Sequence, residues 1–513
     1  MLRHIAIENF KGIGDKVAMD LKPVTLLFGP NSAGKSTILH ALHFLHALLD
    51  SGNADVEDTR IGGAGFDLGG FANFVHDRDL ARAVTIQLTF EPDTDDVIAE
   101  FGDGTTDADE NSLLLDYDAE LLKLTVYLHV GWSEVLGLPL TKMFTLALDG
   151  VPLCGVFCSV DGAAATLFGV NIGHGILRPY NEEEVTTGQV PLNNILPTLY
   201  PCLPGRGSAL PWPDRDPGIN SVGSDVLVDT PTQARVSQLL RGSVALLKRE
   251  LERFRYVGPI RQCPPRNYQP PRRRDEGRWA NGLGAWDAMT ASPTLTKSVS
   301  EWLSGDDRFA SGYRLESAPF REVPENAWEQ ATHAIDFGSE APAHPDLLAA
   351  RRRTRLALIE EDTERAFAPG ELGEGISQVI PVIAAAFATE NDALDGRRVA
   401  TRLVAIEQPE LHIHPRMQVA LGDLFLANKD ERQFIIETHS EHLVLRLLRR
   451  IRETTANTLP PEGYAATVED VAVLYVNRVD GQVRVKELRI APDGDFLDEW
   501  PDGFFIERRK ELF

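Results

Sequence analysis

The chain has 513 residues, about 43% of them apolar, and a formal net charge of −25. This length allows roughly two to four domains or subdomains. So acidic a surface repels phosphate backbones, which argues against broad nonspecific DNA binding. Four cysteines do not form a disulfide framework in a chain of this length. The sequence has no apolar run of about 18 residues and no apolar stretch at its start, so we expect a soluble, cytoplasmic protein without a membrane partner.

The first region, 1–225, predicts a strand–turn–helix unit followed by a β-rich lobe. Residues 24–28 have the apolar pattern of a buried strand, and residues 35–50 place apolar side chains at helical spacing. Short antiparallel strands are expected after this unit, at 82–90, 113–131 and between 142 and 172. The stretch 179–225 is rich in Gly, Pro and Asn and predicts loops.

The second region, 226–370, is expected to be a mainly helical insertion. Residues 231–255 have the pattern of an amphipathic helix, and residues 284–366 read as mostly helical with a break near 318–345. Residues 262–283 are rich in proline and arginine and predict an irregular segment. The absence of a long heptad pattern indicates a globular insertion and not a coiled-coil arm.

The third region, 371–513, returns to strands and helices. Strands are expected at 401–406, 433–437 and 471–477. The last of these forms a hairpin with residues 482–490 around the turn-favouring pair Asp480-Gly481.

Residues 29–37 carry the strongest chemical signal. They match the pattern G-x-x-x-x-G-K-[ST] over its full length: Gly29, Pro30, Asn31, Ser32, Ala33, Gly34, Lys35, Ser36 and Thr37. The glycines let the backbone wrap a phosphate, and the helix start adds partial positive charge. We expect Lys35 to reach the β and γ phosphates of ATP and Ser36 to bind magnesium through its hydroxyl.

A carboxylate partner for the magnesium ion is expected at the end of a later buried strand. Residues 403–407 supply four apolar residues and then Glu407, which is the predicted metal ligand beside Ser36. The next residue is Gln408, whose amide can orient water but is a very poor proton acceptor. Two interpretations stay open: either Glu410 supplies the missing carboxylate, or hydrolysis is slow and the ATP state is long-lived.

Two further residues complete the predicted site. His439 follows a buried strand, where a neutral imidazole can hydrogen-bond a γ-phosphate oxygen. Ser377 lies in the first turn of a helix, where free amides favour an anion. His412 and His414 lie two residues apart, and we favour packing or hydrogen bonding beside the nucleotide over a metal pair.

The order of these motifs resembles ABC-type ATPase heads of the SMC, RecF-like and OLD-like groups. The following segments look most like a bacterial branch of stand-alone AAA-type ATPases: Asn9-Phe10-Lys11, the P-loop, I-E-Q-P-E-L-H-I-H-P at 406–415, E-T-H-S-E-H-L at 437–443 and W-P-x-G-F-F at 500–505. Gly258-Pro259-Ile260-Arg261 belongs to this resemblance weakly. The resemblance as a whole implies an α/β fold, namely an ABC-type (SMC/RecF-like) ATPase head with an antiparallel β-rich lobe and a mainly helical insertion.

The resemblance also implies a homodimer or higher homo-oligomer. Such heads associate head to tail, so that each ATP lies between the P-loop of one copy and the signature loop of the other. Ser377 would then act in trans. The segment 373–378 departs from the usual L-S-G-G-Q pattern, and residues 67–71, where a Q-loop glutamine is expected, contain none.

The sequence predicts no nuclease of its own, because only about 70 residues follow His439. We therefore expect a slow ATPase that acts as a dimerising switch for a partner effector, such as a nuclease or toxin encoded nearby, in antiphage defence. The alternative is a RecF-like ATPase of DNA repair or maintenance, and a third interpretation is a nucleotide-binding scaffold without hydrolysis. Arginine clusters at 272–274, 351–355 and 446–452 leave DNA open as a partner, although solvated helix faces also explain them.

Overall fold

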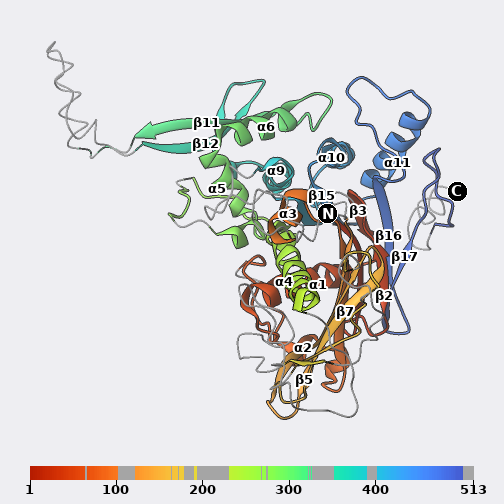
Figure 1. Ribbon diagram of the computed structural model, residues 1–513. Helices are drawn as coiled ribbons and strands as arrows, with labels where there is room; N and C mark the ends of the chain where they lie inside the picture. The colour runs from red at the N-terminus through yellow and green to blue at the C-terminus, as the bar shows by residue number, and fades with distance from the viewer. Residues whose placement is uncertain are drawn as a thin grey trace, which may run out of the picture.

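The computed structural model describes most of the chain (Figure 1). The described residues are 1–63, 66–101, 122–162, 165–171, 173–177, 190–192, 230–266, 268–272, 275–321, 323, 325, 352–389 and 401–500. Several assignments made from the sequence fall outside them. These are the strand residues 113–121, most of the loop stretch 179–225, the arginines at 273, 274 and 351, residues 326–350, which include most of the expected break near 318–345, and the C-terminal motif after Trp500.

A six-stranded sheet is built from strands that are far apart in the chain. Its order is β10-β14-β15-β3-β16-β17, and neighbouring strands are parallel except in the β16–β17 hairpin. The strands are β3 (Val24–Phe28), β10 (Phe254–Val257), β14 (Leu403–Glu407), β15 (Gln433–Thr438), β16 (Val471–Val479) and β17 (Gln482–Glu487). Every residue of β3, β14 and β15 is buried, as is typical of parallel strands covered on both faces.

Helices cover both faces of this sheet. Leu27 packs in one core together with α1 (Lys35–Ser51) and α4 (Thr230–Glu252), whereas its neighbour Leu26 packs in a second core on the opposite face. The helices of the second core are α5 (Leu283–Ala291), α6 (Pro293–Ser304), α9 (Glu374–Phe387), α10 (Pro415–Ala427) and α11 (Glu441–Thr455). Figure 1 shows α9, α10 and α11 on one side of the sheet and α1 and α4 on the other.

An eight-stranded antiparallel sheet forms the predicted β-rich lobe. Its order is β2-β1-β4-β5-β6-β7-β8-β9. The strands are β1 (Leu2–Glu8), β2 (Val17–Asp20), β4 (Ala83–Phe90), β5 (Leu124–Ser133), β6 (Leu138–Leu148), β7 (Val151–Cys158), β8 (Ala165–Phe168) and β9 (Val190–Leu192). Burial alternates along β4, so one face of this sheet points into a core.

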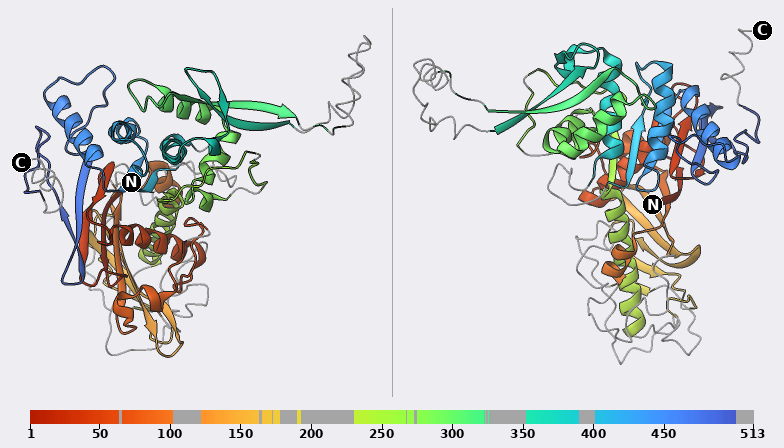
Figure 2. Two further views of the ribbon diagram at one scale, coloured as in Figure 1. Left: turned by 180° about the vertical axis from the view of Figure 1, so that it is seen from behind. Right: turned by 90° about the horizontal axis from the view of Figure 1, so that it is seen from above.

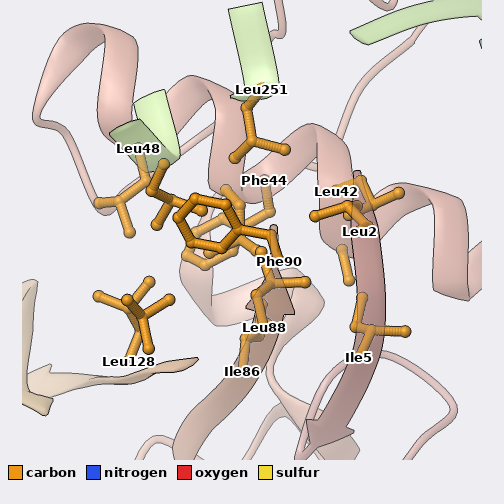
Figure 3. Packing of buried hydrophobic residues seen from close by; sticks show 14 of the residues in the cluster. Leu2, Ile5, Leu42, Phe44, Leu48, Ile86, Leu88, Phe90, Leu128 and Leu251 are labelled. Atoms are coloured by element: carbon orange, nitrogen blue, oxygen red, sulfur yellow. The ribbon is translucent and has the colours of Figure 1, made fainter. Parts of the chain in front are cut away.

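Helix α1 joins the two sheets, because its apolar side chains fill the core between them. Phe44 and Leu48 of α1 meet Leu88 and Phe90 of β4, and Leu251 of α4 closes the cluster (Figure 3). The remaining short elements are α2 (Phe71–Phe74), α3 (Thr94–Phe101) and the 3₁₀ turns η1 (His76–Arg78), η4 (Glu276–Trp279) and η5 (Pro369–Glu371). The helix that follows the P-loop is thereby fixed by a large apolar contact.

The region 226–370 contains strands as well as helices. Helices α4, α5 and α6 confirm its helical part, but the expected helix at 352–360 is wrong. These residues form β12 (Arg352–Glu360), which pairs along its whole length with β11 (Tyr313–Arg321) and then with β13 (Ala366–Phe367). Pairing with β11 and burial of alternate leucines override the helical propensity of the arginines and leucines. Figure 2 shows β11 and β12 as a ribbon that projects from the body.

The helix expected at 231–255 ends earlier than its pattern suggests. Helix α4 stops at Glu252, and Phe254–Val257 form β10, which pairs with β14 at the edge of the six-stranded sheet. The region 226–370 therefore contributes a strand next to the one that ends on Glu407.

Candidate nucleotide and magnesium site

The P-loop connects the end of β3 to the start of α1, as the sequence predicts. A Cβ atom at Gly29 would lie 2.0 Å from the carbonyl oxygen of Val476, and one at Gly34 would lie 2.6 Å from the side chain of Val483. Gly34 also has a φ of 103°, which glycine adopts without strain. Ala33 and Thr37 are buried, whereas the loop residues 30–32 are exposed and accessible to a ligand.

Lys35 lies buried inside this loop. Its Nζ atom donates to the carbonyl oxygens of Gly29 at 3.1 Å and Pro30 at 2.8 Å, and lies 3.8 Å from a carboxylate oxygen of Glu437. Burial lowers the pKa of Lys35, and the nearby carboxylates oppose this shift, Glu437 most strongly. The ammonium group is thus held next to several acids at the place where a phosphate would bind.

Glu407 and Glu437 form a buried carboxylate pair beside the P-loop. They are direct partners on the neighbouring parallel strands β14 and β15. The Ser36 hydroxyl donates to Glu437 Oε2 at 2.7 Å, and the Tyr256 hydroxyl donates to Glu407 Oε1 at 2.9 Å. Burial, and then the charge of Glu437, raises the pKa of Glu407 to about 7. Burial also raises the pKa of Glu437, against the opposing effects of Ser36 and Lys35.

This donor set fits magnesium. Two carboxylates and a hydroxyl are hard oxygen ligands, and the raised carboxyl pKa values show that the site disfavours its own negative charge. In the part of the chain that the structure describes, no three or more His, Cys, Asp or Glu residues cluster so that they could hold a metal ion. Magnesium usually binds one or two carboxylates together with substrate phosphates and water, so the P-loop nucleotide would complete the shell.

Glu410 and His439 meet at the edge of the same site. One carboxylate oxygen of Glu410 accepts the His439 amide at 2.6 Å. The other oxygen of Glu410 and the Nε2 atom of His439 are buried without a hydrogen-bond partner among the described residues. Burial raises the pKa of Glu410, and burial together with the Lys35 charge lowers that of His439 to about 4. The imidazole is therefore neutral near pH 7, as the sequence analysis requires.

Gln408 occupies a strained position between these acids. Its φ is 44°, in the left-handed region, and its amide donates to the Glu437 carbonyl oxygen at 2.7 Å. The turn after β14 is thus fixed to the end of β15. It carries an amide side chain where a proton acceptor would be expected.

Ser377 lies in the first turn of α9, as expected, but its hydroxyl is engaged within the helix. It is 5% exposed, and its Oγ atom donates to the Glu374 carbonyl oxygen at 2.9 Å. Gly373 and Glu374, at the start of the helix, are exposed. The contact of Ser377 with a nucleotide of another copy stays a proposal.

The two histidines after β14 act as local structural residues. The Nδ1 atom of His414 caps α10 by accepting the Arg416 amide at 3.2 Å. His412 is half exposed, and its Nε2 atom lies 3.8 Å from the Glu374 carboxylate. His414 therefore makes a hydrogen bond beside the site, whereas the His412 contact is too long for one.

The arginines of α11 belong mainly to an ion-pair network. Arg446 and Arg450 both bind the buried Asp423, and Arg450 and Arg449 bind Glu453. Paired and partly buried guanidinium groups offer little to a phosphate backbone, so this helix gives no support for DNA binding.

Sequence reasoning missed two side chains of the site, Glu437 and Tyr256, and the buried Arg261, whose guanidinium group donates to main-chain carbonyl oxygens behind it. Glu437 follows an apolar run at 434–436, which is the same signal that identified Glu407. The sequence analysis assigned only His439, two residues later, to the site. Arg261 ends the weak motif Gly258-Pro259-Ile260-Arg261, and Tyr256 lies two residues before that motif. Only the fold brings these two residues to β14.

A polar pocket of about 690 Å³ adjoins the P-loop helix. Its lining includes Lys11, Gly12, His76, Arg478 and Gln482. The Nζ atom of Lys11 lies 2.8 Å from Nδ1 of the α1 residue His40, and burial lowers the pKa of Lys11 to about 8.

Of the C-terminal motif at 500–505, only Trp500 is among the described residues. The Trp500 ring stacks on Phe28, the last residue of β3, with ring centroids 5.7 Å apart. None of the helices described here is long and apolar enough to cross a membrane.

Family models match three parts of the chain. Residues 272–446 match the family described as "AAA domain, putative AbiEii toxin, Type IV TA system", and residues 1–129 match the "AAA ATPase domain" family. Residues 467–513 match the family described as "Protein of unknown function (DUF3696)". The model at 1–129 covers the P-loop, and the model at 272–446 covers the Glu407 and His439 motifs, so together they support a nucleotide-binding ATPase. A comparison with curated proteins found no match.

Solved structures of SMC heads are similar at low identity. An SMC head bound to the C-winged helix domain of ScpA is 11% identical, with 95% of this chain and 97% of that chain covered and a TM-score of 0.39. The SMC head domain from Thermotoga maritima is 11% identical, with 95% of this chain and 99% of that chain covered and a TM-score of 0.37. An SMC head domain with an extended coiled coil, bound to the C-terminal domain of ScpA and derived from Pyrococcus furiosus, is 10% identical. The match covers 100% of this chain and 98% of that chain, with a TM-score of 0.37. These TM-scores are too low to add weight to the fold or the function, which therefore rest on the site and on the family matches.

Proposed function

We propose that the chain is an ABC-type ATPase head of the OLD-like and SMC/RecF-like group, and that it works as an ATP-dependent dimerising switch. The observation that carries the proposal is the cluster of the buried Lys35, Glu407 and Glu437 with the half-buried Ser36, and with Gln408 where a catalytic base is expected. The cluster suits binding of magnesium and ATP. The amide at Gln408 suits a bound state that hydrolyses slowly.

Dimerisation is proposed from what one chain presents on its surface. Gly373 and Glu374 at the start of α9 are exposed, so a second copy can reach this loop. The nucleotide would then be held between the P-loop of one copy and the loop before α9 of the other, with Ser377 close to that contact. Each nucleotide site would take its P-loop from one copy and its α9 loop from the other, so the two sites of a dimer would close at the same time.

Control of a separate effector is proposed because no second catalytic centre is evident in the described part of the chain. The described residues hold no cluster of acids and histidines that could bind the metal ions of a nuclease on its own. The description of one matched family names a toxin of a Type IV toxin–antitoxin system, which fits a switch that restrains or releases a partner. Antiphage defence is the setting we favour. Co-purification with the product of an adjacent gene, in an ATP-dependent manner, is the expected result.

Sedimentation velocity tests the switch directly. The wild type is measured without nucleotide, with ADP and with Mg·ATP, and Lys35→Met serves as the binding-deficient control. We expect Mg·ATP alone to increase the mass of the wild type, with a turnover well below the ~10 s⁻¹ that is typical of enzymes. An unchanged mass in every nucleotide state contradicts the proposal. Turnover that rises on addition of DNA, with a steep salt dependence, favours the RecF-like alternative instead.

A further inference from the structure

Arg261 joins the turn after β14 to helix α9. Only 2% of this residue is exposed, although it carries a charged side chain. Its Nη2 atom donates to the carbonyl oxygens of Glu407 and Gln408, at 3.2 Å for the latter. Its Nη1 atom donates to the carbonyl oxygen of Gln378 in α9 at 3.4 Å. One guanidinium group therefore holds two separate elements.

The main chain of Arg261 makes a second connection to the same helix. Its amide donates to Oε1 of Gln378 at 3.0 Å, and its carbonyl oxygen accepts from Nε2 of Gln378 at 2.5 Å. Both ends of the Gln378 amide are thus satisfied by one residue. A planar guanidinium presents its donors in a rigid fork, whereas the ammonium of lysine is a compact point charge. Lysine cannot therefore reproduce the spacing between the two elements.

The two elements that Arg261 connects also touch each other directly. A Cβ atom at Gly375, in the first turn of α9, would lie 2.5 Å from the His412 carbonyl oxygen. The helix start therefore rests on the segment that follows Glu407. Tyr256, five residues before Arg261, holds the Glu407 carboxylate, so one short segment fixes both the side chain and the carbonyl group of this acid.

We propose that Arg261 is a positioning residue, which couples binding of Mg·ATP at Glu407 to the placement of the loop before α9 for a second copy of the chain. This inference rests on the proposed function, since it requires an ATP-dependent dimer. Binding at Glu407 fixes the turn after β14, and Arg261 transmits that position to α9. Without the guanidinium fork, ATP still binds at the P-loop, but the loop offered to the partner copy is no longer aligned by it.

The test separates nucleotide affinity from ATP-driven association. Arg261→Lys removes the fork and keeps the charge, and Gln378→Met removes the amide bridge and leaves the arginine in place. Arg449→Lys is the matched control, because Arg449 lies on the exposed side of α11 with 60% of its side chain accessible. Each variant is titrated with a fluorescent ATP analogue and magnesium, and its association constant is measured by sedimentation with and without Mg·ATP.

We expect Arg261→Lys to bind the analogue within about threefold of the wild type and to lose about tenfold or more of the ATP-driven gain in association, which lies within the usual range of coupling between sites. Gln378→Met should change in the same direction, and it decides the question if Arg261→Lys does not fold. If either folded variant gains as much association from Mg·ATP as the wild type does, the coupling role of Arg261 is overturned and the proposed function is not. Parallel losses of thermal stability, affinity and association in both variants overturn it in favour of a structural role. A wild type that does not associate with Mg·ATP overturns the proposed function and this inference together.

Discussion

Replacing Glu437 by glutamine should separate magnesium binding from phosphate binding. Glu437 accepts the Ser36 hydroxyl at 2.7 Å, lies 3.8 Å from Lys35 Nζ and pairs in register with Glu407. Glutamine has nearly the same shape, and its carbonyl oxygen can still accept the hydrogen bond from Ser36. The substitution therefore removes a negative charge from the site and changes its packing little.

The size of the effect follows from the charge alone. At an effective dielectric constant of about 20, two unit charges about 8 Å apart interact by roughly 2 kcal/mol. Without magnesium, Glu437→Gln should thus bind ATP about 30-fold more tightly, because a like charge beside the phosphates is gone. With magnesium, the same substitution should instead weaken ATP binding. Loss of even an outer-shell partner of a metal ion typically costs about 10- to 100-fold in metal affinity, and Glu437, which accepts the Ser36 hydroxyl, would be at least such a partner.

The assay is titration of a fluorescent ATP analogue in EDTA and in magnesium. Glu431→Gln is the matched control, because this acid precedes the same strand and 75% of its side chain is exposed. It should not change affinity in either condition. Weaker binding of Glu437→Gln by the same factor in both conditions would refute the reasoning, since Glu437 would then act only on the shape of the P-loop.

Four further changes test other parts of the site. Lys35→Met should reduce ATP affinity at least about 100-fold with folding retained, measured by the same titration and by thermal melting; unchanged affinity would remove the P-loop lysine from the site. Tyr256→Phe deletes a 2.9 Å hydrogen bond to Glu407 and should cost about 1 kcal/mol of unfolding free energy and weaken Mg·ATP binding about threefold. Glu410→Gln should lower turnover about 100-fold at unchanged ATP affinity; equal turnover would show that Glu410 is not the base. The pKa of Glu407 is raised from 4.5 to about 7, so its stabilising effect is full below about pH 4.5 and is lost as the pH rises through 7. Glu407→Gln should therefore flatten the decline of the unfolding free energy between these pH values, by on the order of 3 kcal/mol, in urea titrations, and an unchanged slope would contradict the raised pKa.

Local patterns were sufficient to predict the P-loop and the strand that ends on Glu407. In both cases a short apolar run is followed directly by the functional residue, so the signal lies within a few positions. The same signal is present at Glu437. The sequence does not show, however, that β15 lies between β3 and β14, and it is this order that brings Glu437 to Ser36.

Long-range pairing explains what the sequence could not provide. Tyr256 and Arg261 are about 150 residues from Glu407 in the chain, and periodicity says nothing about contacts over that separation. The amphipathic pattern of 231–255 also continues beyond the real end of α4, because β10 follows it almost directly. Boundaries of this kind are set by the sheet that accepts the strand and not by local propensity.

The site is poorly suited to ATP alone, and this has a consequence for its use as a switch. Glu407, Glu410 and Glu437 all act electrostatically on Lys35, and Glu407 and Glu410 also act on Arg261, yet burial raises the pKa of each acid. A triphosphate without a metal ion would add negative charge to a site that already disfavours its own, whereas a divalent cation relieves both sources of repulsion. The site should therefore respond to Mg·ATP as one ligand. Under the proposed function, with Gln408 in place of a base, we expect this complex to persist and the lifetime of the closed state to depend on how firmly the turn after β14 is held.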